Sequence, residues 1–134
     1  MNPSASDSLP INGPLVTVVM PAFKPMFLRA ALASVAAQRY RDIELVVCDD
    51  HPGDAVRRQV EAFAGSAAFP VRYYANPQRL RESRNGARCV ALAKGQYIKF
   101  LYDDDLLHPD CIAAQAAVLC AHPDIALVTS RRRR

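Results

Sequence analysis

The sequence has 134 residues, of which 51% are apolar and 22% are charged, a balance typical of a single folded domain and not of a disordered chain. The formal net charge of +4 comes from four arginines at 131–134, because the 13 Lys and Arg residues outside this tail match the 13 acidic residues. A basic tail without a basic face does not indicate a nucleic-acid partner. No apolar run reaches the ~18 residues of a membrane span.

The two ends and the cysteines indicate the organisation of the chain. We expect residues 1–14, rich in Pro, Ser and Asn, to form a flexible leader, residues 15–130 to form the domain, and residues 131–134 to form a basic tail. The four cysteines show no CxxC spacing, and the first residues lack a secretion signal. We therefore expect free thiols in a reducing compartment, and hence a cytoplasmic protein without an integral membrane segment.

Short apolar runs alternate with segments of helical periodicity. In chain order, the pattern predicts a strand at 15–20, a helix at 26–37, a strand at 43–48, a helix at 53–64, a strand at 71–75, a helix at 82–94, a strand at 96–101, a helix at 109–121 and a strand at 125–129. This alternation predicts an α/β fold, with a mostly parallel sheet covered by helices on both faces. Ligands of such sheets bind beyond the carboxyl ends of the strands.

Two acidic clusters follow predicted strands. Asp49 and Asp50 follow the second strand, and the fourth strand leads into Asp103, Asp104 and Asp105. Carboxylate oxygens are hard ligands that suit Mg²⁺ or Mn²⁺, and a carboxylate can also accept a hydrogen bond from a base or a ribose. The alternative is structural, because Asp residues cap helices and form turns. The clusters alone leave both interpretations open.

The other residues at the strand ends also have two interpretations. Phe23 follows the first strand and is either a core aromatic or a surface on which a base stacks. The segment 79–84 carries three arginines, which either neutralise phosphates or lie in a solvated loop. Neither GxGxxG nor GxxxxGK[ST] occurs, which counts against a dinucleotide fingerprint and a P-loop. Bound phosphates would therefore need side chains and a metal ion.

Taken in order, these motifs resemble the start of a family 2 glycosyltransferase with the GT-A fold of nucleotide-diphospho-sugar transferases. The resemblance covers 15–130 and rests on four stretches: LVTVVMPAF, LRAALASVAAQRYRDIELVVCDD, ALAKGQYIKFLYDDDLLHPD and HPDIALVTS. The first ends in a Pro-x-aromatic turn, the second in Asp-Asp, and the third contains the acidic motif. The resemblance implies a Rossmann-like nucleotide-sugar-binding domain, the amino-terminal and therefore truncated part of the family's fold.

The resemblance also implies how a nucleoside-diphosphate-sugar donor is bound. The nucleoside base would be bordered by Pro21, Ala22 and Phe23. Asp50 would accept a hydrogen bond from the base, and Arg81, or its neighbour Arg84, would approach the base or the diphosphate. Asp103 would touch the ribose or the metal shell.

The implied cofactor is Mn²⁺ or Mg²⁺, with Asp104 as its chief protein ligand and Asp105 close by. The implied reaction is transfer of the sugar, with inversion, to a hydroxyl of a saccharide or another acceptor, and the metal stabilises the leaving diphosphate. The general base that inversion needs is expected beyond the end of this sequence, so the catalytic residue is unknown. A module that binds nucleotide without transferring sugar is the alternative. Peripheral association with a membrane is compatible with either interpretation.

Overall fold

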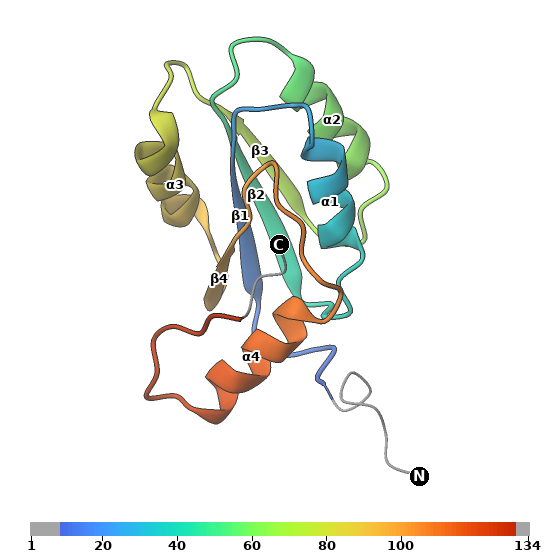
Figure 1. The fold of residues 1–134 in the computed structure, drawn as a ribbon, viewed down its shortest axis with the longest axis vertical. Helices are drawn as coiled ribbons and strands as arrows, with labels where there is room; N and C mark the ends of the chain where they lie inside the picture. The colour runs from blue at the N-terminus through green and yellow to red at the C-terminus, as the bar shows by residue number, and fades with distance from the viewer. Residues whose placement is uncertain (1–8, 131–134) are drawn as a thin grey trace.

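The computed structural model describes residues 9–130, in which four strands and four helices alternate (Figure 1). The elements are β1 (Val16–Ala22), α1 (Leu28–Ala36), β2 (Ile43–Asp49), α2 (Ala55–Ala64), β3 (Val71–Ala75), α3 (Arg81–Leu92), β4 (Tyr97–Phe100) and α4 (Cys111–Ala121). The first eight predicted elements are confirmed, with ends within two residues of those expected.

The predicted strand at 125–129 is wrong. This segment has no strand geometry, and most of its residues are exposed. Its one backbone hydrogen bond to another part of the described chain is local, from Ile125 N to the carbonyl of His122. Apolar and β-branched composition favours a strand, but a strand forms only where a neighbour completes its backbone hydrogen bonds. Within residues 9–130, no neighbour does so for this segment.

The predicted leader and tail are only partly described by the structure. Residues 1–8 and 131–134 lie outside the described residues. Residues 11–14 are tied to the domain, because Arg41 N donates to the Ile11 carbonyl at 2.6 Å and Gly13 N donates to Asp42 Oδ2 at 2.9 Å. The amino-terminal approach to β1 therefore packs beside the start of β2.

The sheet is parallel throughout, in the order β3-β2-β1-β4. The chain moves outward from β1 to β2 and β3, and then returns to pair β4 with the other side of β1. The strand order thus reverses at β1, and a parallel sheet has its binding crevice at such a point, beyond the carboxyl ends of the strands. The turns after β1, β2 and β4 all lie at this carboxyl edge, drawn at the top of Figure 1.

Helices cover both faces of the sheet, which confirms the predicted α/β architecture. Every residue of β1 and β2 is buried, as expected for central strands of a doubly covered sheet. Alternate residues such as Val18 and Met20 pack with α1, α2 and α4 in the larger core, whereas Val19 faces Cys89 of α3. Figure 1 shows α3 on one side of the sheet, and α1 with α2 on the other.

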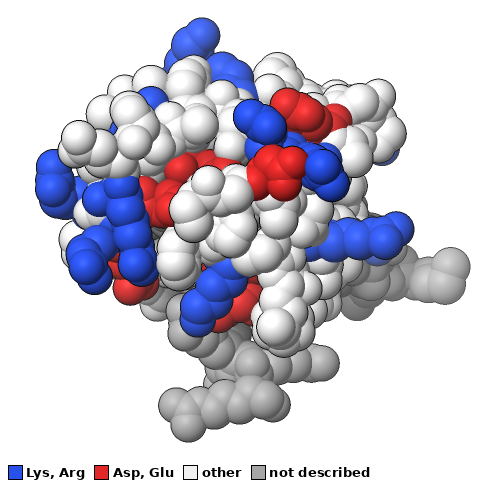
Figure 2. Space-filling view, turned by 90° about the horizontal axis from the view of Figure 1, so that it is seen from above, with Lys and Arg blue, Asp and Glu red and all other residues white. Residues whose placement is uncertain are grey.

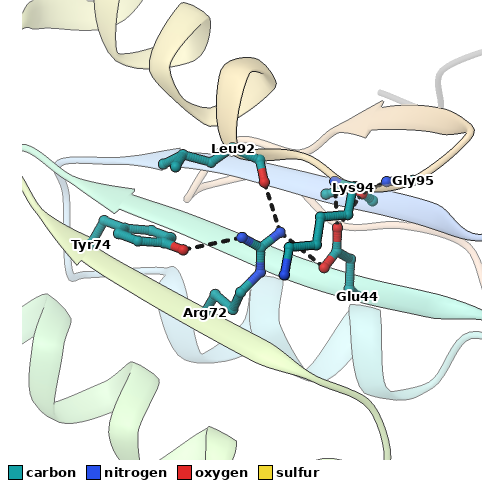
Figure 3. A network of polar contacts seen from close by, with 7 residues as sticks. Glu44, Arg72, Tyr74, Leu92, Lys94 and Gly95 are labelled. Carbon is teal, nitrogen blue, oxygen red and sulfur yellow. Dashed lines mark hydrogen bonds and ion pairs between the residues drawn. The ribbon is translucent and has the colours of Figure 1, made fainter.

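A network of polar residues lies at the other end of the sheet, on the α3 face (Figure 3). We call Thr17, Glu44, Arg72 and Lys94 the amino-end network. The buried Glu44 carboxylate accepts hydrogen bonds from Thr17 Oγ1 at 2.6 Å and from Lys94 N at 2.8 Å, and it pairs with Arg72 Nη2 at 2.9 Å. Burial would raise the pKa of Glu44, but these hydrogen bonds and the arginine lower it below its ordinary value.

The turn between α3 and β4 completes this network. Gly95 N donates to Thr17 Oγ1 at 2.8 Å. A Cβ atom at Gly95 would lie 2.6 Å from the backbone nitrogen of Thr17, a separation that real Cβ atoms do not show. Only glycine allows this close approach, so Gly95, three residues beyond the end of α3, docks β4 beside β1.

Candidate functional site

A cavity of about 490 Å³ opens at the carboxyl edge of the sheet, and we call it the donor cavity after the ligand that the sequence resemblance implies. All eight residues predicted for nucleotide or metal binding line it: Pro21, Ala22, Phe23, Asp50, Arg81, Asp103, Asp104 and Asp105. The lining is completed by Lys24, Arg79, Glu82, Asn85 and Tyr102. Parallel topology therefore brings together four segments of the sequence: the turn after β1, the residue after β2, the start of α3 and the loop after β4.

The four aspartates of this cavity differ in how they are held, beginning with Asp103. Asp103 is buried, and its Oδ2 atom accepts hydrogen bonds from Phe23 N at 2.7 Å and Lys24 N at 2.6 Å. These two bonds fasten the loop after β4 to the turn after β1. One oxygen of Asp103 is thus occupied in shaping the cavity wall.

Asp50 holds the loop that leads into α3. Its Oδ1 accepts hydrogen bonds from Asn76 Nδ2 at 2.7 Å and Leu80 N at 2.8 Å, and its Oδ2 accepts one from Arg81 N at 2.7 Å. Arg81 has a φ of 67°, a left-handed conformation that costs a non-glycine residue energy. Burial would raise the pKa of Asp50, but the hydrogen bonds and the nearby charge of Arg79 lower it.

Two asparagines that the sequence did not single out support Asp50. Asn85 is buried, donates to the Cys48 carbonyl at 2.9 Å, and accepts a hydrogen bond from Asn76 Nδ2 at 2.8 Å. Asn76 Nδ2 also reaches Asp50, so the loop is braced from α3 as well as from β2. The spacing in the sequence could have pointed to Asn85, because it lies four residues before Cys89 and therefore on the same buried face of α3.

Phe23 and Arg79 line both the donor cavity and a second, neighbouring cavity. The guanidinium carbon of Arg79 lies 4.1 Å from the centroid of the Phe23 ring, a cation–π contact. The second cavity, of about 480 Å³, shares Phe23, Asp50 and Arg79 with the first and extends to His51 and Tyr73. Phe23 is therefore partly exposed between two cavities, as a stacking surface would be, and is not a core residue.

Asp104 and Asp105 contrast with Asp50 and Asp103. Asp104 is exposed and Asp105 is half-buried. Within residues 9–130, neither carboxylate takes part in a hydrogen bond or an ion pair with another side chain or with the backbone. No group of three or more His, Cys, Asp or Glu side chains in that range gathers as a metal site. Two free carboxylates nevertheless fit Mg²⁺, which commonly takes one or two carboxylates together with water and substrate phosphates.

The charges at this edge are arranged in a way that suits a phosphorylated ligand. Figure 2 views the molecule from above this edge, with acidic side chains across the middle and basic side chains on either side. The basic residues that line the donor cavity are Lys24, Arg79 and Arg81. Arginine guanidinium groups match phosphate oxygens in geometry and charge, while a divalent cation would balance the free carboxylates.

Solved structures share this fold. Staphylococcus aureus TarS in complex with UDP-GlcNAc superposes with a TM-score of 0.71 at 18% identity, over 81% of this chain and 32% of TarS 1–349. The mannosyltransferase PcManGT from Pyrobaculum calidifontis, in complex with GDP-Man and Mn²⁺, superposes with a TM-score of 0.73 at 22% identity, over 79% of this chain and 32% of its own. The fold and the cavity thus define a domain of the GT-A class.

The family follows from the sequence match. The glycosyl transferase family 2 profile matches residues 17–134, and the chain belongs to this family. It is 35% identical over 95 residues to the UDP-Glc:alpha-D-GlcNAc-diphosphoundecaprenol beta-1,3-glucosyltransferase WfgD of Escherichia coli. It is 30% identical over 97 residues to the GalNAc(5)-diNAcBac-PP-undecaprenol beta-1,3-glucosyltransferase of Campylobacter jejuni. The matches cover 69% and 70% of this chain, but only 36% and 31% of those proteins.

None of the helices in the described part of the chain is both long enough and apolar enough to cross a membrane.

Proposed function

We propose that this domain binds a nucleoside-diphosphate-sugar in the donor cavity, and that the glycosyltransferase containing it transfers the sugar to an acceptor hydroxyl with inversion. The observation that carries the proposal is the different state of the four aspartates that line the cavity. Asp50 and Asp103 are occupied in holding loops, whereas Asp104 and Asp105 have no hydrogen-bond or ion-pair partner within residues 9–130. UDP-GlcNAc and GDP-Man bound to TarS and PcManGT support a donor of this class.

The residues of the cavity can each take a part in donor binding. The exposed face of Phe23 can stack on the base, with Pro21 and Ala22 beside it. Asp50 accepts three hydrogen bonds, and a carboxylate has about four lone-pair sites, so it retains room for one N–H group of a base. Arg79 and Arg81 carry the charge that would neutralise the diphosphate.

Asp104 and Asp105 are the residues that would hold Mn²⁺ or Mg²⁺. Such an ion, when bound, supplies positive charge that stabilises the diphosphate as the glycosidic bond breaks. The contribution of the chain itself is geometric, because Asp103 fixes the turn beside Phe23 and so sets the distance between the base and phosphate ends of the cavity. The PcManGT complex contains Mn²⁺ with its donor, which supports this cofactor.

The acceptor side of the proposal rests on the relatives. WfgD and the Campylobacter enzyme are named for acceptors linked through diphosphate to a polyprenol, so we propose a hydroxyl of a saccharide, free or lipid-linked. We assign no general base to residues 9–130. The four cysteines are free thiols, which supports our further proposal of a cytoplasmic location.

The test is calorimetry of UDP and GDP with and without Mn²⁺. Mn²⁺ should strengthen binding of one of them to the wild-type chain, and Asp104→Ala should remove that strengthening while leaving the unfolding free energy within about 0.5 kcal/mol, since an exposed group is removed. Asp124→Ala, another exposed aspartate, is the matched control and should behave as wild type. An equal effect of Mn²⁺ on Asp104→Ala would contradict the metal assignment, and absence of nucleotide binding would contradict the donor site.

A second candidate function is nucleotide binding without transfer. This chain spans about a third of WfgD and of TarS 1–349, and we assign no general base within residues 9–130. The two functions separate in one assay. Release of nucleoside diphosphate from a bound nucleotide sugar, together with a glycosylated acceptor, requires the enzyme, whereas metal-dependent binding without product by the full-length protein that contains this domain indicates the module.

A further inference from the structure

The turn between β1 and α1 presents two large apolar side chains to solvent beside the donor cavity. Met26 is 80% exposed and Phe27 is 57% exposed. Neither lines one of the two cavities described above, and neither belongs to the core of the described residues. Leu106, 68% exposed, lies on the loop after β4 that Asp103 ties to this turn. Exposed apolar groups that gather at the mouth of a site mark an interaction surface more often than single scattered ones do.

This turn is held in place on both sides. Asp103 accepts hydrogen bonds from the backbone N–H groups of Phe23 and Lys24, and Gln59 of α2 donates to the Pro25 carbonyl at 3.0 Å. Leu28, directly after the exposed pair, is fully buried. The exposure of Met26 and Phe27 is therefore imposed by the fold around them.

The charged residues next to the apolar pair in the sequence are basic, whereas Asp104 and Asp105 on the neighbouring loop are acidic. Lys24 and Arg29 flank it, both are exposed, and neither forms an ion pair within residues 9–130. Arg29 lies in the first turn of α1, where a cation opposes the helix dipole and where no acidic residue is present. The N-cap position is Phe27, which offers no side-chain acceptor to the first N–H groups of the helix. Ser or Asp at this position would stabilise the helix more than Phe27 does.

We propose that Met26 and Phe27 dock this domain onto an anionic phospholipid surface. The two apolar side chains would enter the boundary between headgroups and acyl chains, while Lys24, Arg29 and the N-terminus of α1 would face the lipid phosphates. This turn lies at the upper edge of the molecule in Figure 1, and its residues Phe23 and Lys24 line the donor cavity, so docking would turn the cavity toward the bilayer. A lipid-linked acceptor would then reach the donor cavity at the bilayer surface. Only this statement about the acceptor rests on the proposed function.

The experiment is co-sedimentation of the full chain with phosphatidylcholine vesicles, with and without phosphatidylglycerol. The wild-type chain should bind vesicles that contain phosphatidylglycerol. The double variant Met26→Ser/Phe27→Ser should bind them about tenfold more weakly or less, because two apolar insertions are lost. Arg29→Glu should weaken binding to these vesicles and remove its dependence on salt. Thermal unfolding of each variant checks that it remains folded.

Matched controls separate this surface from others. Ile125→Ser/Leu127→Ser removes two apolar residues that are 39% and 79% exposed. They belong to the segment after α4, which Figure 1 draws in dark red in the lower part of the molecule, and this variant should bind as wild type. Deletion of 131–134 should also leave binding in place. Equal binding by both double variants, loss of binding only with the arginine tail, or no binding by the wild-type chain would overturn the proposal. A dimer that dissociates in Met26→Ser/Phe27→Ser, with no vesicle binding, would identify a second copy as the partner instead.

Nucleotide calorimetry on the same variants keeps this proposal apart from the proposed function. Met26→Ser/Phe27→Ser leaves the lining of the donor cavity intact and should bind nucleoside diphosphate as the wild-type chain does. Loss of vesicle binding with normal nucleotide binding supports the docking surface. Vesicle binding by a chain that binds no nucleotide would support docking and refute the donor site.

Discussion

The two ends of this sheet hold buried carboxylates in different ways. At the amino end, Glu44 is paired with the guanidinium group of Arg72 and sealed beneath α3. At the carboxyl end, Asp50 and Asp103 accept hydrogen bonds from neutral N–H groups of nearby loops. Neutral donors satisfy an oxygen without cancelling its charge. The amino end is therefore a neutral structural clamp, whereas the carboxyl end keeps negative charge that a cation can use.

This difference between the two ends predicts which substitutions affect the stability of the fold and which affect ligand binding. A buried charge that loses its partner destabilises the fold strongly, so the amino-end network should affect stability most. A carboxylate that is exposed and unpaired, such as Asp104, contributes little to stability and is available to a ligand. Substitutions at the two ends of the sheet should therefore affect different measurements.

The largest effect on stability is expected from Glu44→Ala. It leaves Arg72 without its carboxylate beneath α3, and the free energy of unfolding should fall by about 3 kcal/mol, measured by urea denaturation. Nucleotide affinity should be unchanged. Glu61→Ala is the control, because Glu61 is exposed and its pairing with Arg57 is long at 4.0 Å, and it should change stability by less than about 0.5 kcal/mol. Similar losses in both variants would refute the clamp.

Acidification should remove part of the same stability. The pKa values of Glu44 and Asp50 are both lower in the folded protein than in the unfolded chain, where they are about 4.3 and 3.9. Their contribution is therefore complete above those unfolded values and is lost as the pH falls through the lower folded values. Urea denaturation from pH 6 to pH 3 should show a smaller loss for Glu44→Gln than for wild type. Parallel curves would contradict the assignment.

An intermediate effect is expected from Asp103→Ala. It leaves the N–H groups of Phe23 and Lys24 without their acceptor, and it should cost about 2 kcal/mol in unfolding free energy. Nucleotide affinity should also fall, with and without metal, because the turn that carries Phe23 is loosened. Asp103→Asn keeps an acceptor oxygen and should recover part of both losses. A variant that loses stability but binds nucleotide normally would show that the turn needs no such anchor.

A smaller effect on stability than that of Asp103→Ala is expected from Asp50→Asn. The amide keeps one acceptor oxygen but turns a donor toward the N–H groups of the loop, which should cost about 1 kcal/mol. Nucleotide affinity should fall about tenfold even without metal, because the loss of one charge-assisted hydrogen bond is of this size. Calorimetry beside urea denaturation checks both quantities. Normal affinity without metal would exclude Asp50 from the nucleoside site.

The sequence by itself determined the alternation of elements and the place of the site. Periods of two and 3.6 residues are local properties of a chain, so eight of nine elements were predicted, with ends within two residues. Parallel connection then obliges the residues that follow β1, β2 and β4 to meet at one edge. For this reason Phe23, Asp50 and Asp104 could be predicted to share one cavity before any coordinates were known.

Tertiary structure decided which carboxylates are free and which side chains are exposed. Asp103 reaches a partner 80 residues away and Asp50 reaches partners about 30 residues away, and no local pattern encodes contacts at such separations. The bracing by Asn85, the exposure of Phe27 and the missing strand at 125–129 have the same origin. Hydrogen-bond partners and burial are set by how distant segments pack, whereas the sequence pattern sets only which face and which edge each residue occupies.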